Sequence, residues 1–294
     1  MFLFIDSWNI LSPTFYSNYN LKDKFGYNGI NTFSKALFNI SYNNVPNLDT
    51  ENDLHIAVQA HIYFIGLTGE IFQRLKNIEF KFDLFITITS SKNKDFIKTY
   101  IENNTQIKKY EIKIVNNKGR DVLPFLEQMK KNIKNYKYIC HIHTKKSIHI
   151  TWGDIWRNYL QNNLLGDKKL VNEIFYNFEK KEDLGFVFPE LIYLFHIDSA
   201  RKINTGHRNY LNLLLKIIFP NKNYKVNNII DFPAGNMFWA KTKAVYQIFD
   251  ININDFVPNE NGQKDFTIIH AVERIWLYLI KLNGFYYQKI FKSF

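Results

Sequence analysis

The sequence predicts an α/β protein in which a mainly parallel β-sheet is flanked by helices. From residue 54 onward, short apolar runs rich in β-branched and aromatic residues alternate with segments of helical spacing. Hydrophobic residues make up 46% of the 294 positions, which is enough to bury a substantial core. Strands and helices that alternate at this spacing are typical of a doubly wound parallel sheet.

Each strand is predicted from a run whose length and composition suit burial in a sheet. The run at 54–64 is largely apolar, as expected for a parallel strand that helices cover on both faces. The run at 82–89 is rich in β-branched residues, which favour strands. The other strands are predicted at 110–115, 136–142, 184–188 and 235–240.

Helices are predicted between these strands. In 68–76, Ile71, Phe72 and Leu75 recur at helical spacing, and a Ser-Ser pair provides a capping start for the next helix. The other helices are predicted at 90–100, 122–133, 152–164, 168–178, 242–249 and 265–281. The stretch 190–230 has mixed patterning and is given no element, apart from a loop at 204–209.

The domain organisation follows from where this alternation begins. Residues 1–53 are rich in Asn, Ser and Tyr and have weak periodicity, so we expect an N-terminal extension. The remaining residues, 54–294, contain no internal repeat and no linker between independent domains. We therefore expect one α/β domain over 54–294, with the extension packed on it.

Charge and cysteine content narrow the class of protein. Lys and Arg number 38 against 27 Asp and Glu, and this net charge of +11 favours an anionic partner. A Lys-rich composition alone would also produce such a charge. Cys140 is the single cysteine, so neither a disulfide framework nor a cysteine-based zinc site can form.

The same features bear on localisation. No signal peptide is recognisable at the N-terminus, and no apolar stretch reaches the length that spans a bilayer. We expect a cytoplasmic protein. Because of its positive charge, peripheral contact with the anionic inner face of the cytoplasmic membrane is a further option.

Cationic and hydroxyl side chains follow the predicted strand at 136–142. Ligands of α/β proteins bind at the carboxyl ends of strands, so this cluster predicts an anionic ligand, with phosphate as the first candidate. Strand alternation puts His141 and His143 on one face, where two imidazoles could bind a metal, although no carboxylate pair accompanies them. The favoured interpretation is instead that one histidine is buried and hydrogen-bonded, while Lys145 or Lys146 provides the charge at the sheet edge. The residues that follow the strand are His143, Thr144, Lys145 and Lys146.

A second candidate lies at the strand-to-helix turn that contains Gly119, Arg120 and Asp121. Backbone N–H groups at a helix start bind anions, and glycine permits close approach of the ligand. Arg120 could bind a diphosphate with two hydrogen bonds or pair with Asp121. The spacing alone favours the alternative that Asp121 only caps the helix and Arg120 is a solvated surface group.

The third candidate is the loop and helix that begin at Glu260. Glu260 lies in a loop rich in Pro, Asn and Gly, and Asp265 is placed to cap the following helix. His270, Glu273 and Arg274 fall within about one turn of that helix, so Glu273 could orient either neighbour. A purely structural network of these three residues is an equal alternative.

The order of these segments resembles a known family. HIAVQAHIYF, FDLFITIT, NNKGRDVLPFL, YICHIHTKKS, LGFVFPE, GNMFWAKTKAV and ENGQKDFTIIHAVER together resemble the rhamnan synthesis protein F family, whose members are regarded as bacterial polysaccharide-assembly glycosyltransferases. The resemblance is collinear over roughly residues 54–290. Asn236 and Phe266 depart from the pattern, because Thr and Gly are expected there.

The same order also resembles the nucleotide-diphosphosugar transferase fold called GT-A, which implies a GT-A-like sheet. In that fold an Asp-x-Asp metal site normally ends the fourth strand, whereas His143, Thr144 and Lys145 stand there in this chain. The resemblance thus implies that cationic and hydroxyl groups neutralise the leaving diphosphate directly. No metal cofactor is favoured, with a divalent ion as the alternative.

The resemblance implies transfer of a sugar, with rhamnose as one candidate, from a nucleotide-diphosphate donor to a hydroxyl of a cell-surface polysaccharide such as capsule, O-antigen or rhamnan. The acceptor is a glycan or a lipid-linked glycan, and nucleic acid is not an expected partner. Glu260 or Asp265 would be the base, with Glu260 preferred because Asp265 has a capping role. The donor-binding residues would be Gly119, Arg120, Asp121, His143, Thr144, Lys145 and Lys146, supported by His270, Glu273 and Arg274.

Two other classes of function stay open at this point. One is a non-catalytic or phosphate-transferring component of polysaccharide assembly. The other is a basic nucleic-acid-binding protein, although the lysines are scattered and no nucleic-acid-binding motif is recognisable.

Overall fold

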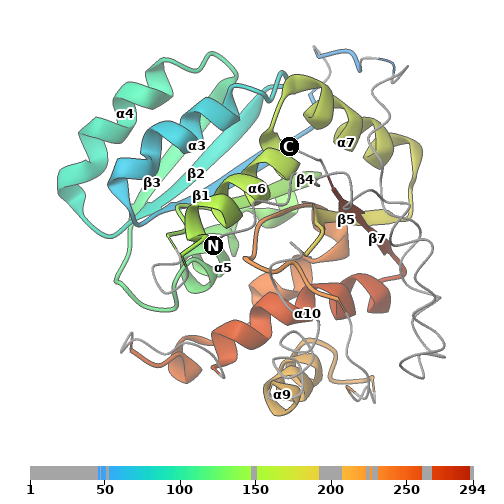
Figure 1. Ribbon diagram of the computed structural model, residues 1–294. Coiled ribbons are helices and arrows are strands. Elements are labelled where there is room, and N and C mark those ends of the chain that lie inside the picture. Colours follow the sequence, from blue (N-terminus) through green and yellow to red (C-terminus); the bar gives the residue numbers. More distant parts are fainter. Residues whose placement is uncertain are drawn as a thin grey trace, which may run out of the picture.

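The computed structural model describes residues 46, 48–50, 53–146, 151–191, 207–222, 226, 231–259 and 267–291. Most of the predicted extension at 1–53 lies outside these residues, as do Glu260, Asp265 and Phe266. Within the described part, seven strands form one sheet in the order β3-β2-β1-β4-β6-β5-β7 (Figure 1). The strands are β1 (Ile56–Ile62), β2 (Phe82–Ile88), β3 (Ile107–Ile114), β4 (Tyr138–His143), β5 (Leu184–Pro189), β6 (Phe238–Lys241) and β7 (Tyr286–Ile290).

The sheet is mainly parallel. β1 pairs in parallel with β2 and β4, β2 with β3, and β5 with β7, whereas β6 runs antiparallel between β4 and β5. The carboxyl ends of the six other strands therefore meet at one edge, and β6 begins at that edge. The predicted α/β class with a mainly parallel, GT-A-like sheet is confirmed.

Helices cover both faces of the sheet (Figure 1). On one face α3, α4, α6 and α7 share one hydrophobic core with the even-numbered residues of β1, and α7 packs against β5. On the other face α5 packs on β1 and β2, and α10 contacts both α5 and α9. The helices are α3 (Thr68–Leu75), α4 (Lys94–Glu102), α5 (Val122–Met129), α6 (Gly153–Leu165), α7 (Lys168–Lys180), α9 (Arg208–Ile218) and α10 (Ile268–Leu282).

Strand alternation explains how the two faces differ. In β1, Ile56, Val58 and Ala60 point into the apolar core under α3 and α6. The intervening Gln59 and His61 are also buried but lie on the α5 face, because successive side chains of a strand point to opposite faces. Polar residues are thus buried on the face of the sheet that α5 and α10 cover.

Several predicted elements differ in the structure. The helix predicted at 242–249 is a pair of short 3₁₀ turns, Thr242–Ala244 and Tyr246–Asp250. The Thr242 hydroxyl donates to the carbonyl of Tyr136 and so holds the first turn against the start of β4. The helix predicted at 122–133 ends at Met129, and a 3₁₀ turn completes the path to β4.

Two elements were not predicted. α9 buries Leu211, Leu214 and Leu215 at helical spacing, but interspersed Asn and Lys obscure that pattern in the sequence. β7 pairs with β5 at the end of the sheet, and its short run of five residues provides little periodicity.

Candidate functional site

The turn before α5 holds a backbone conformation that side chains rarely adopt. Gly119 has φ of 69° and Arg120 has φ of 54°, so two successive residues lie in the left-handed region. A Cβ atom on Gly119 would lie 2.4 Å from Cβ of Leu123. Position 119 therefore requires glycine, and non-glycine residues in the conformation of Arg120 are concentrated at functional sites.

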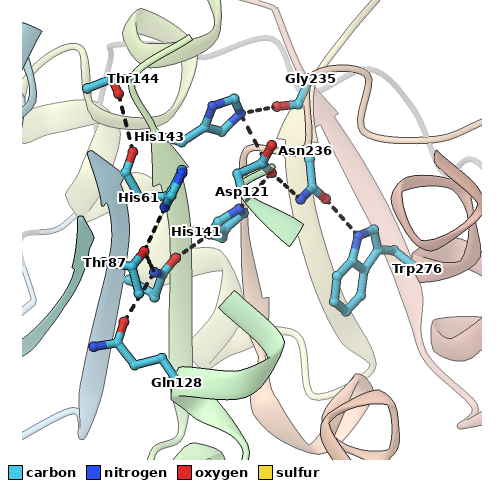
Figure 2. Close-up of polar contacts among 11 residues, drawn as sticks. His61, Thr87, Asp121, Gln128, His141, His143, Thr144, Gly235, Asn236 and Trp276 are labelled. Carbon is cyan, nitrogen blue, oxygen red and sulfur yellow. Dashed lines mark hydrogen bonds and ion pairs between the residues drawn. The ribbon is translucent and has the colours of Figure 1, made fainter. Parts of the chain in front are cut away.

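Asp121 is the residue around which the buried polar groups gather (Figure 2). Its Oδ2 accepts hydrogen bonds from Asn236 Nδ2 at 2.8 Å and from His141 Nε2 at 3.2 Å, and His143 Nε2 lies 3.9 Å away. Asp121 is the N-cap residue of α5, but its side chain makes no capping hydrogen bond. The alternative that Asp121 only caps the helix is therefore wrong.

Electrostatics favour an ionised Asp121. Burial opposes ionisation, but interactions with His143 and His141 and the hydrogen bond from Asn236 outweigh it, so the pKa of Asp121 lies well below its usual value. The site therefore contains a buried carboxylate whose hydrogen-bond donors come from β4 and from the loop before β6.

The loop before β6 is the second strained element of the site. Gly235 has φ of 91° and Asn236 has φ of 53°, and Asn tolerates this region better than most residues. Asn236 is fully buried and its Oδ1 accepts from Trp276 Nε1 of α10 at 2.9 Å. Asn236 thus links the carboxylate of Asp121 to the helix that follows Glu260.

His143 is the last residue of β4, one residue beyond the predicted strand, and it is not a cationic group at neutral pH. Its Nε2 donates to the carbonyl of Gly235 at 2.8 Å, and burial lowers the pKa of His143 to about 4. Burial also lowers the pKa of His61 to about 4. The expectation that His143 supplies positive charge to a diphosphate is therefore corrected, and that charge must come from other residues.

Lys145 and Arg120 are the cations beside Asp121. Lys145 is half-buried, with Nζ 3.9 Å from the centre of the Trp156 ring. Burial lowers the pKa of Lys145 below its usual value, Glu273 and Asp121 oppose that shift, and Arg120 adds to it. The structure therefore brings together the predicted Arg120, Asp121, Lys145 and Glu273.

The other two residues after β4 have different surroundings. The Thr144 hydroxyl accepts from the backbone N–H groups of Tyr63 at 2.9 Å and Phe64 at 3.0 Å, so it fastens the end of β4 to the end of β1. Lys146 is exposed, and its Nζ lies 5.5 Å from the centre of the Phe64 ring. Thr144 therefore shapes this edge, and Lys146 is a solvated cation.

The first turn of α10 joins the turn before α5. Arg120 Nη1 donates to His270 Nε2 at 2.9 Å, so Arg120 is not merely a solvated surface group. His270 Nδ1 lies 2.8 Å from the hydroxyl of Thr267, which is the N-cap residue of α10. Thr267 is therefore the N-cap residue of this helix, and Asp265, for which a capping role is expected, lies outside the described residues.

Glu273 and Arg274 complete this part of α10. Burial raises the pKa of Glu273 above its usual value, Arg274 opposes the shift, and Asp121 adds to it. Arg274 Nη1 donates to the carbonyl of His270 at 2.5 Å, and its guanidinium group lies 4.6 Å from the centre of the Phe232 ring. Arg274 therefore stabilises the first turn of α10.

The segment before Glu260 reaches the same edge. Asn259 forms an isolated antiparallel bridge with Lys118, which is the residue before Gly119. Lys118 Nζ also donates to the carbonyl of Asn254 at 3.0 Å. Asn259, the residue before Glu260, therefore lies beside the turn that carries Arg120. Glu260 and Asp265 themselves lie outside the described residues.

Sequence reasoning missed a chain of buried polar groups that continues from His141 into the sheet (Figure 2). Gln59, Thr87 and Gln128 are buried, and hydrogen bonds link them to His141. The signal was present as polar residues at alternate positions of buried strands, at Gln59 and His61 and again at His141 and His143.

Two findings concern a metal and a membrane. In the described residues, no three His, Cys, Asp or Glu side chains are arranged as metal ligands. Metal independence stays a prediction, because Glu260 and Asp265 lie outside those residues. No described helix combines the length and apolarity that a bilayer span requires.

Comparison with known proteins finds a family model and two relatives that are similar to this chain in sequence. A sequence model of the family described as rhamnan synthesis protein F matches residues 31–285. The uncharacterized protein WxcX from two strains of Xanthomonas campestris pv. campestris is 26% identical over 281 residues, or 92% of this chain. The chain spans 37% of the length of these relatives.

Proposed function

The chain belongs to the rhamnan synthesis protein F family, whose model covers residues 31–285, and from this premise we propose that it is a glycosyltransferase. Membership indicates a role in polysaccharide synthesis. The proposed reaction transfers a sugar, with rhamnose as one candidate, from a nucleotide-diphosphate donor to a hydroxyl of a bacterial surface polysaccharide. A component of polysaccharide assembly without this activity would not turn over such a donor.

One observation carries the proposal. At the carboxyl edge of a GT-A-like sheet, Lys145 interacts electrostatically with Arg120 and with the buried carboxylate of Asp121. In α/β proteins ligands bind at this edge, and cations there suit a diphosphate whose negative charge grows as its bond to the sugar breaks. Arg120 and Lys145 would stabilise the leaving diphosphate, and Asp121 would accept a hydrogen bond from a hydroxyl of the donor.

The acceptor hydroxyl must lose a proton as the sugar is transferred. Glu260 is the proposed base, with Asp265 as the alternative. The bridge between Asn259 and Lys118 supports the choice of Glu260 as the base, because it holds Asn259, the residue before Glu260, at the edge of the sheet that carries the cations. Glu260→Gln should abolish transfer with the thermal unfolding temperature retained, and unchanged turnover would assign the role to Asp265.

Metal independence is part of the proposal. Arg120 and Lys145 would supply the positive charge that a divalent ion supplies in transferases with an Asp-x-Asp site. Full transferase activity of purified protein in EDTA is expected. Strict dependence on manganese or magnesium would contradict this part.

Donor binding tests the site directly. We expect dTDP-linked or UDP-linked sugars to raise the thermal unfolding temperature of the protein, and Lys145→Met to reduce that rise. Lys130→Met is the matched control, because Lys130 is exposed at the end of α5. Equal binding by both variants would show that the donor does not occupy the edge beside Asp121.

The acceptor is proposed to be a growing glycan or a lipid-linked glycan. A net charge of +11 would favour contact with the anionic inner face of the cytoplasmic membrane, where lipid-linked acceptors are accessible. Cosedimentation with vesicles that contain anionic lipid, at low salt and at high salt, measures this contact.

A further inference from the structure

A chain of hydrogen bonds from Gln128 to Asp121 determines which atoms near Asp121 carry hydrogens (Figure 2). The chain begins at the backbone carbonyl of Ile86. Gln128 Nε2 lies 3.2 Å from the carbonyl oxygen of Ile86 and 3.2 Å from Glu111 Oε1. A backbone carbonyl can only accept, so the amide nitrogen of Gln128 must face it. The amide oxygen of Gln128 therefore points towards Gln59.

Gln59 transmits this orientation to β4. Its Nε2 lies 3.3 Å from Gln128 Oε1 and 3.2 Å from Thr87 Oγ1, which uses both of its amide hydrogens. Gln59 Oε1 then faces His141 Nδ1 at 2.7 Å. Because an amide oxygen only accepts, His141 Nδ1 carries a hydrogen.

The other ring nitrogen of His141 also faces an acceptor. Nε2 lies 3.2 Å from Asp121 Oδ2, which accepts a second hydrogen bond from Asn236 Nδ2 at 2.8 Å. The pKa of Asp121 lies well below its usual value, with the hydrogen bond from Asn236 among the causes, so this carboxylate is ionised and can only accept. Nε2 therefore carries a hydrogen as well. A histidine with hydrogens on both nitrogens is an imidazolium ion.

The surroundings of the ring suit a positive charge. The ring stacks on Phe125, with centroids 4.1 Å apart and an interplanar angle of 10°. Burial disfavours a charged His61 and a charged His143, and both are neutral at pH 7. Three titratable groups face His141 directly: Asp121 at the start of α5, His143 on β4 and His61 on β1. Glu111 of β3 is linked to it through Gln128. Lys145 and Glu273 lie farther away, beyond Asp121.

We propose that His141 is a buried imidazolium that keeps Asp121 ionised and fixes its Oδ2, leaving Oδ1 to accept a hydrogen bond from a substrate hydroxyl. Among the described residues, the hydrogen bonds to this carboxylate all go to Oδ2. His141 has no exposed surface, whereas the Asp121 side chain is 10% exposed. His141 is thus a positioning residue that acts through Asp121. The part that concerns a substrate rests on the proposed function, and the charge of His141 does not.

The charge is tested by NMR of protein with ¹⁵N-labelled histidine. At pH 7, both ring nitrogens of His141 should show the chemical shifts of protonated nitrogen, whereas those of His61 and His143 should show neutral rings. His141→Gln assigns the resonance, and the exposed His55 gives a solvent-accessible ring in the same spectrum. A neutral His141 at pH 7 in the wild-type protein would overturn the proposal, and this result requires no variant to fold.

A second measurement tests the link to Asp121. In Asp121→Asn the counter-charge is absent, so His141 should become neutral at pH 7, which a purely structural role for His141 would not require. Persistence of the imidazolium signal in a folded Asp121→Asn protein would contradict the pairing. His141→Gln should weaken binding of a nucleotide-sugar by about 10- to 100-fold, the range for loss of a hydrogen bond to a charged group.

His61→Gln is the matched control, because His61 belongs to the same chain of hydrogen bonds through Thr87 but not to the pair with Asp121. It should bind within about threefold of wild type, since it loses no hydrogen bond to a charged group. If the wild type binds and His141→Gln binds equally well, the substrate part is wrong. If the wild type binds no nucleotide-sugar, the proposed function fails, and the NMR result still decides the charge of His141.

Discussion

Replacing Asn236 with alanine should destabilise the protein strongly, because one side chain satisfies two buried groups. Asn236 is fully buried, donates to Asp121 Oδ2 at 2.8 Å and accepts from Trp276 Nε1 at 2.9 Å. Alanine removes a hydrogen bond to a charged group, which is worth about 1.5–3 kcal/mol. It also leaves the buried indole N–H unpaired, at a cost of about 1–3 kcal/mol.

Backbone strain adds to this loss. Asn236 has φ of 53°, a region that costs an ordinary residue about 1–2 kcal/mol and asparagine less. The free energy of unfolding of Asn236→Ala should therefore fall by about 3–6 kcal/mol, a large part of the ~5–15 kcal/mol that stabilises a typical domain. Asn236→Gly loses the same two hydrogen bonds without the strain, so it should be about 1 kcal/mol more stable than Asn236→Ala.

Urea unfolding followed by tryptophan fluorescence measures both differences as shifts of the transition midpoint at constant slope. An Asn236→Ala variant within about 1 kcal/mol of the wild type would refute the role of these hydrogen bonds, because one unpaired buried donor should already cost more than that. A glycine variant no more stable than the alanine variant would show that the strain argument is wrong.

Three further predictions concern the turn before α5, the buried histidines and a part-buried lysine that pairs with two carboxylates. Gly119→Ala should lower the unfolding temperature and weaken donor binding, because the new Cβ would lie 2.4 Å from Cβ of Leu123. An alanine variant with wild-type stability would show that the turn does not require the backbone conformation of Gly119. The free energy of unfolding should fall as the pH drops from about 6.5 to about 4, because histidines of the unfolded chain take up protons in that window, whereas buried His61 and His143, with a pKa of about 4, do not. Each of the two histidines contributes up to ~3 kcal/mol to this change. Equal free energies of unfolding in urea titrations at pH 7 and pH 4.5 would count against the burial of these rings. Lys289→Met should lower the free energy of unfolding in denaturant by about 3–5 kcal/mol, because Lys289 Nζ lies 2.6 Å from Glu190 and 2.7 Å from Asp231, and both part-buried carboxylates would lose their counter-charge. Lys134→Met removes an exposed ion pair and should cost at most about 1 kcal/mol. Equal losses for the two variants would contradict this prediction.

Much of the fold could be predicted from local patterns. The strands around Val58, Leu84 and Ile139 were predicted because buried parallel strands are runs of apolar residues, a property of the local sequence. The 3₁₀ turns after β6 were predicted as one helix, since the hydrogen bond from Thr242 to Tyr136 joins residues 106 positions apart. A pattern within ten residues does not contain that constraint.

The candidate site, too, could be predicted only in part from the sequence. Arg120, Asp121 and Lys145 were predicted from their place after strands, and the structure brings them to one edge. The neutral state of His143 was not predicted, because it depends on burial and on the carbonyl of Gly235, 92 residues away.

By itself, the sequence determined the α/β class, the succession of strands and helices, and the edge at which charged residues gather, because hydrophobic periodicity and strand direction are local properties. Only the tertiary structure decided which of those residues carry charge. Asp121, His141 and Asn236 come from three separate segments and meet only when the sheet is assembled. Protonation there depends on burial and on partners in space, and neither can be inferred from neighbours along the chain.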